Sequence, residues 1–264
     1  MTPPCGDDVV VRTTTELEDR TAGRSRRPLV ILAVLAVVAV GAIAVVYMAF
    51  FNEDAPAPFT LSDQPATSAP AVTSAAGGTA TAGSGLAGTW RVASGSEAGY
   101  RVREKLVRLP AQSDAVGRTP AVSGTVRVEG SGGSLVATDA RFEADLTRLT
   151  SDEANRDRRI RTQGLQTDTF PKATFVSTQP IPLPAETATG RGVKVQAEGD
   201  LTLHGVTKRV TIPLDVRVTG EKGELTGSLT FPMSDFAIDP PNVAGVVTVD
   251  SDATLEFKLV LERA

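Results

Sequence analysis

The chain has 264 residues with one cysteine and one histidine, and its 31 acidic and 27 basic side chains leave a formal net charge of -4. These counts exclude an internal disulfide framework and a Cys/His zinc cage. The slight acidic balance and the 5% aromatic content also argue against nucleic acid as a partner, because such binders normally present a basic face or stacking rings.

One long uncharged run, at residues 29–51, lies near the start of the chain. As a helix it would be about 34 Å long, which is enough to cross a bilayer. Arginines cluster just before the run and two acids, Glu53 and Asp54, follow it. The positive-inside rule therefore predicts a cytoplasmic disordered tail at 1–28, a single transmembrane helix at 29–51, and an extracytoplasmic location for everything after it.

A cleaved signal peptide is the alternative interpretation of this run. The apolar part of a signal peptide is usually about 7–15 residues long and ends at a small-residue cleavage site. Here the run is longer and ends in Phe50 and Phe51, so an uncleaved anchor is favoured. Cys5 precedes the run, which does not suit a lipoprotein cysteine.

Residues 52–85 consist mostly of Ala, Thr, Pro, Ser and Gly. Such a composition buries too little apolar surface to offset the entropy cost of ordering. It predicts a disordered linker with a root-mean-square reach of roughly 30–35 Å. A G-x-G-x-x-G pattern at 83–88 lacks the flanking strand and helix of a dinucleotide site, so no cofactor is expected there.

The remaining residues, 86–264, alternate apolar and polar side chains with the period of β-strands. Long alternating runs are expected at 136–146, 193–203, 206–218 and 247–261, and shorter strands at 89–93, 99–108, 122–129, 173–178 and 224–231. In the first run the shared apolar face holds Val136, Thr138, Ala140, Phe142, Ala144 and Leu146. The one expected helix covers 151–162 with Ser151 as its N-cap, and 108–120 is expected to be a loop.

Eight or nine one-sided antiparallel strands must hide their apolar faces, and closing the sheet does so without leaving edges. We therefore predict an all-β domain built as an antiparallel eight-stranded barrel with one short helix, with a two-sheet sandwich as the alternative. A barrel of this size is either filled or holds one small ligand. Small inner residues interspersed with phenylalanines favour an apolar channel.

Several motifs, in order along the chain, resemble those of YceI-like domains. The run GDLTLHGVTK at 199–208 resembles the signature hairpin of that family, and DTFPKATF at 168–175 resembles its approach to a strand. The opening TWRV at 89–92, the basic segment around Asn155 and Arg159, and SDF at 234–236 are further matches. The similarity covers about 90–261, although Arg159 and Ala237 replace a His and a Gly that the family often has.

The resemblance implies a secreted or periplasmic, lipocalin-like barrel that encloses a polyisoprenoid chain. We accordingly expect a membrane-tethered, extracytoplasmic lipid-binding protein whose partners are an isoprenoid lipid or quinone tail and, through 29–51, the bilayer. The predicted channel lining is Tyr100, Val126, Phe142, Phe175, Leu201, Ile212, Val216, Leu229, Phe231 and Phe257. The alternative function is an envelope protein-interaction module with a filled barrel and no ligand.

Catalysis is the least favoured function. His204, the only histidine, is expected on a polar strand face beside a turn, which suits a turn-stabilising or solvated residue better than a catalytic base. No G-x-S-x-G elbow accompanies it. The arginines of 156–161 could attract lipid phosphates, but the acids among them favour a self-neutralised helix face. We predict no catalytic residues, no metal and no cofactor.

Overall fold

The computed structural model describes residues 55–62, 85–106, 112–131, 134–240 and 247–264. The predicted tail at 1–28, the predicted transmembrane helix at 29–51 and most of the predicted linker lie outside these residues. Among the residues that are described, no helix is both long enough and apolar enough to cross a membrane.

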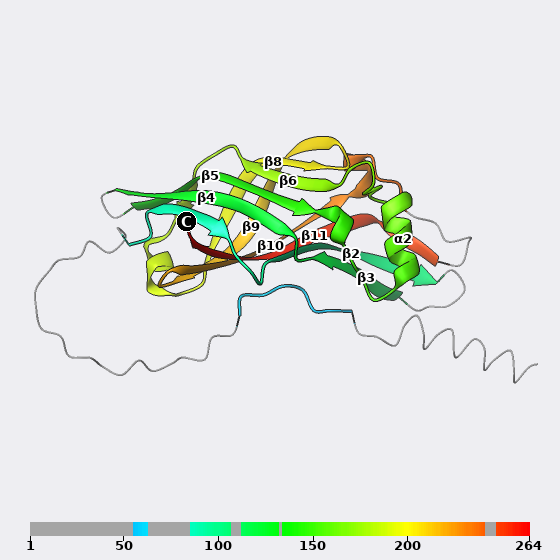
Figure 1. Ribbon diagram of the computed structural model, residues 1–264, viewed down its shortest axis with the longest axis horizontal. Coiled ribbons are helices and arrows are strands. Elements are labelled where there is room, and N and C mark those ends of the chain that lie inside the picture. Colours follow the sequence, from blue (N-terminus) through cyan, green and yellow to red (C-terminus); the bar gives the residue numbers. More distant parts are fainter. Residues whose placement is uncertain (1–54, 63–84, 107–111, 132–133, 241–246) are drawn as a thin grey trace, which may run out of the picture. The chain divides into compact units, whose positions relative to one another are not determined.

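Eleven strands form one antiparallel sheet in the described part of the chain (Figure 1). They are β1 (Gly88–Val92), β2 (Glu97–Leu106), β3 (Gln112–Thr119), β4 (Val122–Ser131), β5 (Ser134–Asp145), β6 (Lys172–Ser177), β7 (Ile181–Leu183), β8 (Val193–Leu203), β9 (Val206–Thr219), β10 (Lys222–Pro232) and β11 (Val247–Arg263). One α-helix, α2 (Ala154–Thr162), and the short 3₁₀ helices η1 (Leu146–Arg148), η2 (Ala185–Thr189) and η3 (Met233–Phe236) join them.

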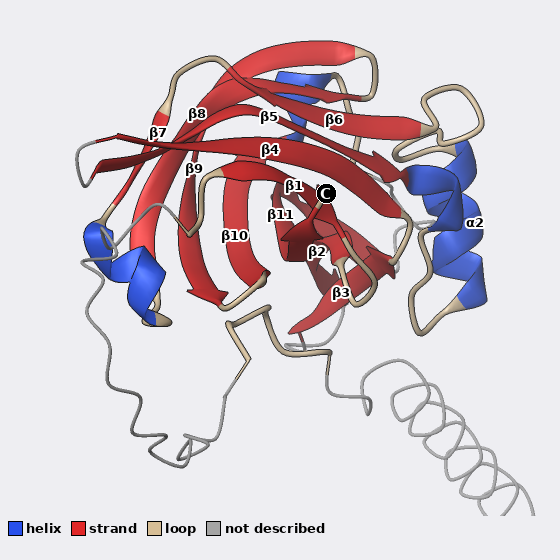
Figure 2. Cartoon of the chain, turned by 60° about the vertical axis from the view of Figure 1, so that its left-hand side comes forward, coloured by secondary structure: helices blue, strands red, loops and turns tan. Residues whose placement is uncertain are grey.

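The sheet closes because β11 pairs along both edges. One edge pairs with β10; the other pairs with β2 over its first part and with β1 at its end. Strand β1 also pairs with β4, which closes a ring of eight strands in the order β1-β4-β5-β6-β8-β9-β10-β11. Figure 2 shows these strands curving around a common interior. The predicted eight-stranded antiparallel barrel is confirmed, and the two-sheet sandwich is not what forms.

Two strands occur where the sequence predicts none. Strand β3 occupies most of the expected loop at 108–120 and pairs with β2 along its whole length. Its sequence, QSDAVGRT, places Ala115 and Val116 side by side and so has no clear alternation. Strand β7 has three residues, pairs with β5 and contains Pro182. Both strands form because a neighbouring strand offers an edge to pair with, which local sequence does not reveal.

Strand β5 reverses its inward face partway along. The sequence predicts that Val136 and Thr138 face inward, but Leu135 and Ala137 are the buried residues there, at 3% and 6% exposure. Asp139 has a φ of +50°, and β5 has one extra residue opposite β4 at this point. One extra residue in a strand turns every later side chain to the other face. The predicted face is therefore wrong before Asp139 and correct after it.

The helix expected at 151–162 begins three residues later, at Ala154. Glu153, not Ser151, is the N-cap, and its side chain accepts a hydrogen bond from the Asn155 backbone N–H. The Ser151 hydroxyl instead donates to Asp157. Arg156 forms ion pairs with Asp152, which precedes the helix, and with Glu104 on β2. Helix α2 lies at the end of the barrel away from the C-terminus (Figure 1).

Two clusters of buried side chains fill different parts of the interior. The first, around Trp90, Leu135, Leu225 and Leu261, belongs to the end of the barrel near the C-terminus. The second gathers around Phe231, Phe236 and neighbours from β3, β8, η1 and η3, towards the end where α2 lies. The Phe231 and Phe236 rings meet edge to face with centroids 4.9 Å apart.

Candidate functional site

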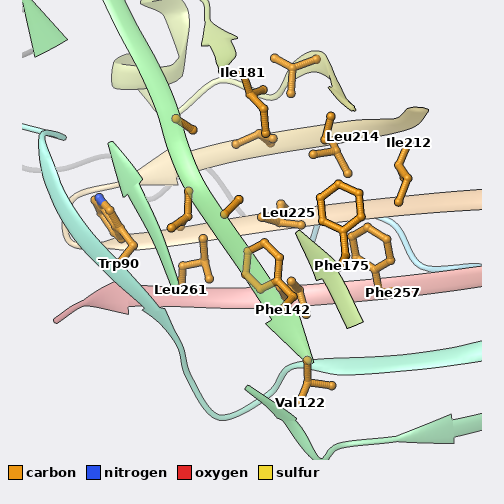
Figure 3. Close-up of a pocket in the computed structure, with 18 of the residues that line it drawn as sticks. Trp90, Val122, Phe142, Phe175, Ile181, Ile212, Leu214, Leu225, Phe257 and Leu261 are labelled. Carbon is orange, nitrogen blue, oxygen red and sulfur yellow. The ribbon is translucent and has the colours of Figure 1, made fainter. Parts of the chain in front are cut away.

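An apolar cavity of about 140 Å³ lies inside the barrel, lined mostly by the first cluster. Its lining comes from most strands of the ring and includes Trp90, Phe142, Phe175 and Phe257, which Figure 3 shows around a common space. Nearly all the lining residues are apolar. Two carboxylates at its boundary are already ion-paired, Glu143 with Lys172 and Glu224 with Arg217. The cavity therefore suits an apolar ligand.

We call this cavity the channel, and its lining extends along the barrel wall. Along β11 its lining extends from Leu255 to Leu261, which is about 20 Å at the rise of a β-strand. A compact cavity of similar volume holds a molecule of roughly benzene size. An apolar lining of this extent suits a hydrocarbon chain.

Three inward-facing glycines allow aromatic rings to lie close to the barrel wall. A Cβ atom added to Gly227 would lie 2.6 Å from the Phe257 ring, and one added to Gly199 would lie 2.4 Å from the Phe175 ring. Gly124 has the same relation to Phe142, at 2.5 Å. Each ring thus occupies space that a larger residue would fill, a known way of covering glycine in sheets. Three of the small inner residues that predicted a cavity thus have this specific role.

Seven of the ten predicted lining residues lie at this channel. They are Val126, Phe142, Phe175, Leu201, Ile212, Val216 and Phe257. The other three, Tyr100, Leu229 and Phe231, belong to the second cluster. Alternation correctly places these three on the inner face, but it does not distinguish the hollow part of the barrel from the filled part.

Tyr100 is a packing residue at the filled end. Gly117 on β3 is its partner in the sheet, and a Cβ atom added to Gly117 would lie 2.4 Å from the Tyr100 ring. Burial raises the pKa of its hydroxyl, while the Arg156 guanidinium acts in the opposite direction. The hydroxyl therefore stays protonated at neutral pH.

His204 lies in the turn between β8 and β9, with a φ of +51°. It is 8% exposed and lies edge-on to the Phe170 ring, with centroids 4.4 Å apart. Its Nδ1 is 3.1 Å from the Phe236 carbonyl oxygen, so Nδ1 carries the proton in this hydrogen bond. The turn-stabilising role is what the structure shows; the expected position on a solvated polar face is wrong.

Several lining residues were not among the predicted ones. One is Ala137, which faces inward together with Leu135 because of the β5 bulge. Leu135 itself does not line the cavity. Ile181 and Leu183 come from β7, which is too short for alternation to identify. Leu225, in contrast, alternates with inward glycines on β10 and could have been found by the pattern already used.

The closed antiparallel ring with its apolar interior defines the class of small β-barrels that enclose a channel. The family model for the YceI-like domain matches residues 90–261, which is more than half of the chain. The protein therefore belongs to the YceI-like family, as its motifs predict.

Similar proteins occur in several bacteria. A UPF0312 protein of Vibrio parahaemolyticus is 33% identical over 119 residues, covering 42% of this chain and 58% of the relative. A UPF0312 protein of Pseudomonas syringae pv. tomato is 32% identical over 127 residues, covering 46% and 62%. The chain thus spans less than two thirds of the length of these curated relatives.

Solved structures with a similar fold include BcnA of Burkholderia cenocepacia, with a TM-score of 0.45 and 21% identity, covering 62% of this chain and 95% of that one. Another is a polyisoprenoid binding domain from Saccharophagus degradans implicated in plant cell wall breakdown, with a TM-score of 0.49 and 18% identity, covering 67% and 99%.

Proposed function

We propose that this protein binds the apolar chain of a polyisoprenoid lipid, such as a quinone tail, inside its barrel. The observation that carries the proposal is the channel itself, whose lining is apolar and extends about 20 Å along β11. Burial of apolar surface would drive binding, at about 0.8 kcal/mol for each methylene removed from water. No step of chemistry is required of the protein.

The length of the ligand depends on how far the channel opens. At about 140 Å³ the channel is too small for a long polyisoprenoid without some widening. The rings of Phe142, Phe175 and Phe257 lie along the wall, and small shifts of such side chains change the width of the channel. We propose that the ligand enters as an extended chain while its head group stays outside.

We further propose that the barrel works outside the cytoplasm, tethered to the membrane by residues 29–51. The uncharged run, the arginines before it and the acids after it support this arrangement. A tethered carrier stays close to the bilayer that supplies and receives its lipid. The competing proposal, a filled barrel that serves only as an interaction module, is less well supported because the interior contains a channel.

Native mass spectrometry of the full chain, purified in mild detergent from an envelope that contains its own lipids, tests lipid binding. We expect a co-purifying mass that corresponds to an isoprenoid lipid. The variant Phe142→Asp should lose this mass, since it places a charge in the channel. Arg141→Asp is the matched control, because Arg141 is the next residue on β5 and is exposed.

Because Phe142→Asp could unfold the barrel, Val216→Phe provides a second test that narrows the channel without adding a charge. Circular dichroism reports whether each variant is folded. A wild-type chain that is free of lipid and takes up neither ubiquinone nor menaquinone would overturn the proposal in favour of the interaction module.

A further inference from the structure

Two polar residues on the outer wall of the barrel are buried, although outward side chains normally face water. Glu256 on β11 is 2% exposed and Thr226 on β10 is 4% exposed. The Glu256 carboxylate is held by two arginines: Arg101 Nε donates to Oε2 at 3.2 Å and Arg118 Nη2 donates to Oε1 at 2.9 Å. A buried carboxylate needs such partners. Pairing between strands does not cover the outer face of the sheet. The burial of Glu256 and Thr226 therefore requires another segment of the chain to lie over this face.

The cover is part of the predicted linker, residues 55–62, which we call the strap (blue in Figure 1). Arg101 Nη2 donates to the Pro56 carbonyl oxygen at 2.5 Å, and Arg118 Nη2 donates to the Ala57 carbonyl oxygen at 2.7 Å. The Arg118 guanidinium also lies 3.9 Å from the centroid of the Phe59 ring. Each arginine therefore joins a buried carboxylate of the wall to the backbone of the strap.

A second group of charges holds the end of the strap. The Ser62 hydroxyl and backbone N–H both donate to Glu224 Oε1, at 2.7 and 3.0 Å. Arg217 Nη2 donates to the Ser62 carbonyl oxygen at 2.6 Å, and Lys258 Nζ donates to its hydroxyl at 2.7 Å. All the hydrogen-bonding groups of Ser62 thus have partners on β9, β10 or β11. Hydrogen bonds to charged groups are about twice as strong as neutral ones.

The sequence of the strap suits this role. Pro56 and Pro58 favour extended backbone at themselves and at the residues before them. A proline-rich extended segment has free carbonyl oxygens, and grooves on other proteins recognise such segments. Here arginines supply the donors, and the Phe59 ring lies against the Arg118 guanidinium. The expected disorder of 52–85 therefore does not describe residues 55–62.

We propose that the outer wall formed by β2, β3, β9, β10 and β11 is a peptide-docking site, that its occupant is the strap of the same chain, and that docking shortens the tether between membrane and barrel. The contacts above support the docking of the strap. The shortening of the tether rests on the proposed anchoring by residues 29–51.

Chain length sets the size of the effect. Three residues, 52–54, separate the predicted transmembrane helix from the strap, and the four steps from residue 51 to residue 55 cover at most about 15 Å. An undocked linker over 52–85 would instead reach roughly 30–35 Å. Docking therefore keeps this wall of the barrel next to the bilayer, and release lets the barrel move away from it.

Spin-label distances in the full chain test docking. Labels would be placed at Thr60→Cys on the strap and Glu129→Cys on β4, both exposed positions, in a Cys5→Ser background reconstituted in lipid nanodiscs. We expect one narrow distance distribution. The double variant Phe59→Ser/Ser62→Ala should broaden it and speed proteinase K cleavage within 55–62 about tenfold. Ser68→Ala makes the same serine-to-alanine change in the linker outside the strap. It should leave the distance distribution and the cleavage rate unchanged.

A broad distribution in the parent chain, or equal broadening by Ser68→Ala, would overturn docking. The variants change only the strap, so the barrel should remain folded, and its melting transition checks this. Neutron reflectivity on supported bilayers should show the barrel moving outward in the double variant. Extraction of the chain by alkaline carbonate would overturn the anchoring, and a lipid-free mass spectrum would overturn lipid binding; neither result would affect the spin-label outcome.

Discussion

At the scale of single residues, glycines determine where this barrel is hollow. Gly227 on β10 is paired with Phe257 on β11, and the aromatic ring lies over it. The nearest atoms to an added Cβ there are the ends of two side chains, Phe257 at 2.6 Å and Leu214 at 2.7 Å. Both side chains line the channel, so the absence of a side chain at Gly227 keeps them against the wall.

We predict that Gly227→Ala narrows the channel by pushing Phe257 and Leu214 inward. Crowding of this kind costs about 1–3 kcal/mol, which urea unfolding would measure, and uptake of a fluorescent isoprenoid should fall markedly. Gly223→Ala is the control on the same strand and face, because its nearest neighbour is Leu261 Cβ at 3.3 Å and no ring lies over it. Equal uptake by the two variants would contradict this role of Gly227.

Also at the residue scale, we predict that strap docking depends on the ionisation of Glu224. Partial burial alone would raise the pKa of this carboxyl, but hydrogen bonds from Ser62, Lys258 and Arg217 lower it to about 2 from an ordinary value of 4.5. A lowered pKa means that the contribution of the carboxylate is complete above about pH 4.5 and is lost as the pH falls towards 2. Spin-label distances for the strap should broaden over that window.

The variant Glu224→Gln removes this titration. It should show weaker docking at pH 7 and a flatter response between pH 4.5 and 2 than the wild-type chain. If both chains respond to acid alike, then another group controls docking.

At the scale of elements, the bulge in β5 shows how one residue decides which side chains line the interior. Asp139 is 70% exposed at its side chain and has a φ of +50°, a region that Asp tolerates better than most residues. Before it Leu135 and Ala137 face inward, and after it Ala140 and Phe142 do so. Residues 134–145 therefore follow two alternating patterns, one before Asp139 and one after it, and these patterns are shifted by one residue relative to each other.

We predict that two changes at this bulge differ strongly in their effect on stability. Deletion of Asp139 should turn Leu135 and Ala137 outward, and loss of two buried apolar side chains costs several kcal/mol. Asp139→Gly keeps the extra residue and relieves the positive φ, so its stability should stay within about 1 kcal/mol of wild type. Thermal unfolding followed by circular dichroism compares them. A deletion variant as stable as wild type would show that β4 and β5 can pair in another register.

At the scale of the whole molecule, the barrel has one hollow and one filled part. In the second cluster the Phe231 and Phe236 rings pack edge to face, and the His204 turn lies beside them. The first cluster surrounds the channel. A missing packing partner lowers local stability, so the hollow part is where a ligand has most to add.

We therefore predict that ligand binding protects the barrel unevenly. A quinone present at 100 times its Kd should stabilise the fold by about 2.7 kcal/mol, seen as a higher Tm. Amide hydrogen exchange should slow more in β1, β7 and the start of β10 than in β3 or η3. Uniform protection, or protection mainly around Phe236, would place the ligand elsewhere.

The sequence by itself determined the class of fold, the family, and most inward faces of β8, β9 and β11. It could do so because each of these strands is long, keeps one phase, and carries a strong apolar–polar contrast against water on one side and the interior on the other. Four of the predicted lining residues, Leu201, Ile212, Val216 and Phe257, lie at the channel for the same reason.

The tertiary structure alone decided the rest. Closure through the two edges of β11, the existence of β3 and β7, the phase change at Asp139 and the hollow and filled parts of the interior all depend on which strands become neighbours. Docking of residues 55–62 is the same kind of property, since its donors come from β2, β3, β9 and β11. Local alternation predicts whether a side chain faces inward, but contacts between distant segments decide which residues surround it.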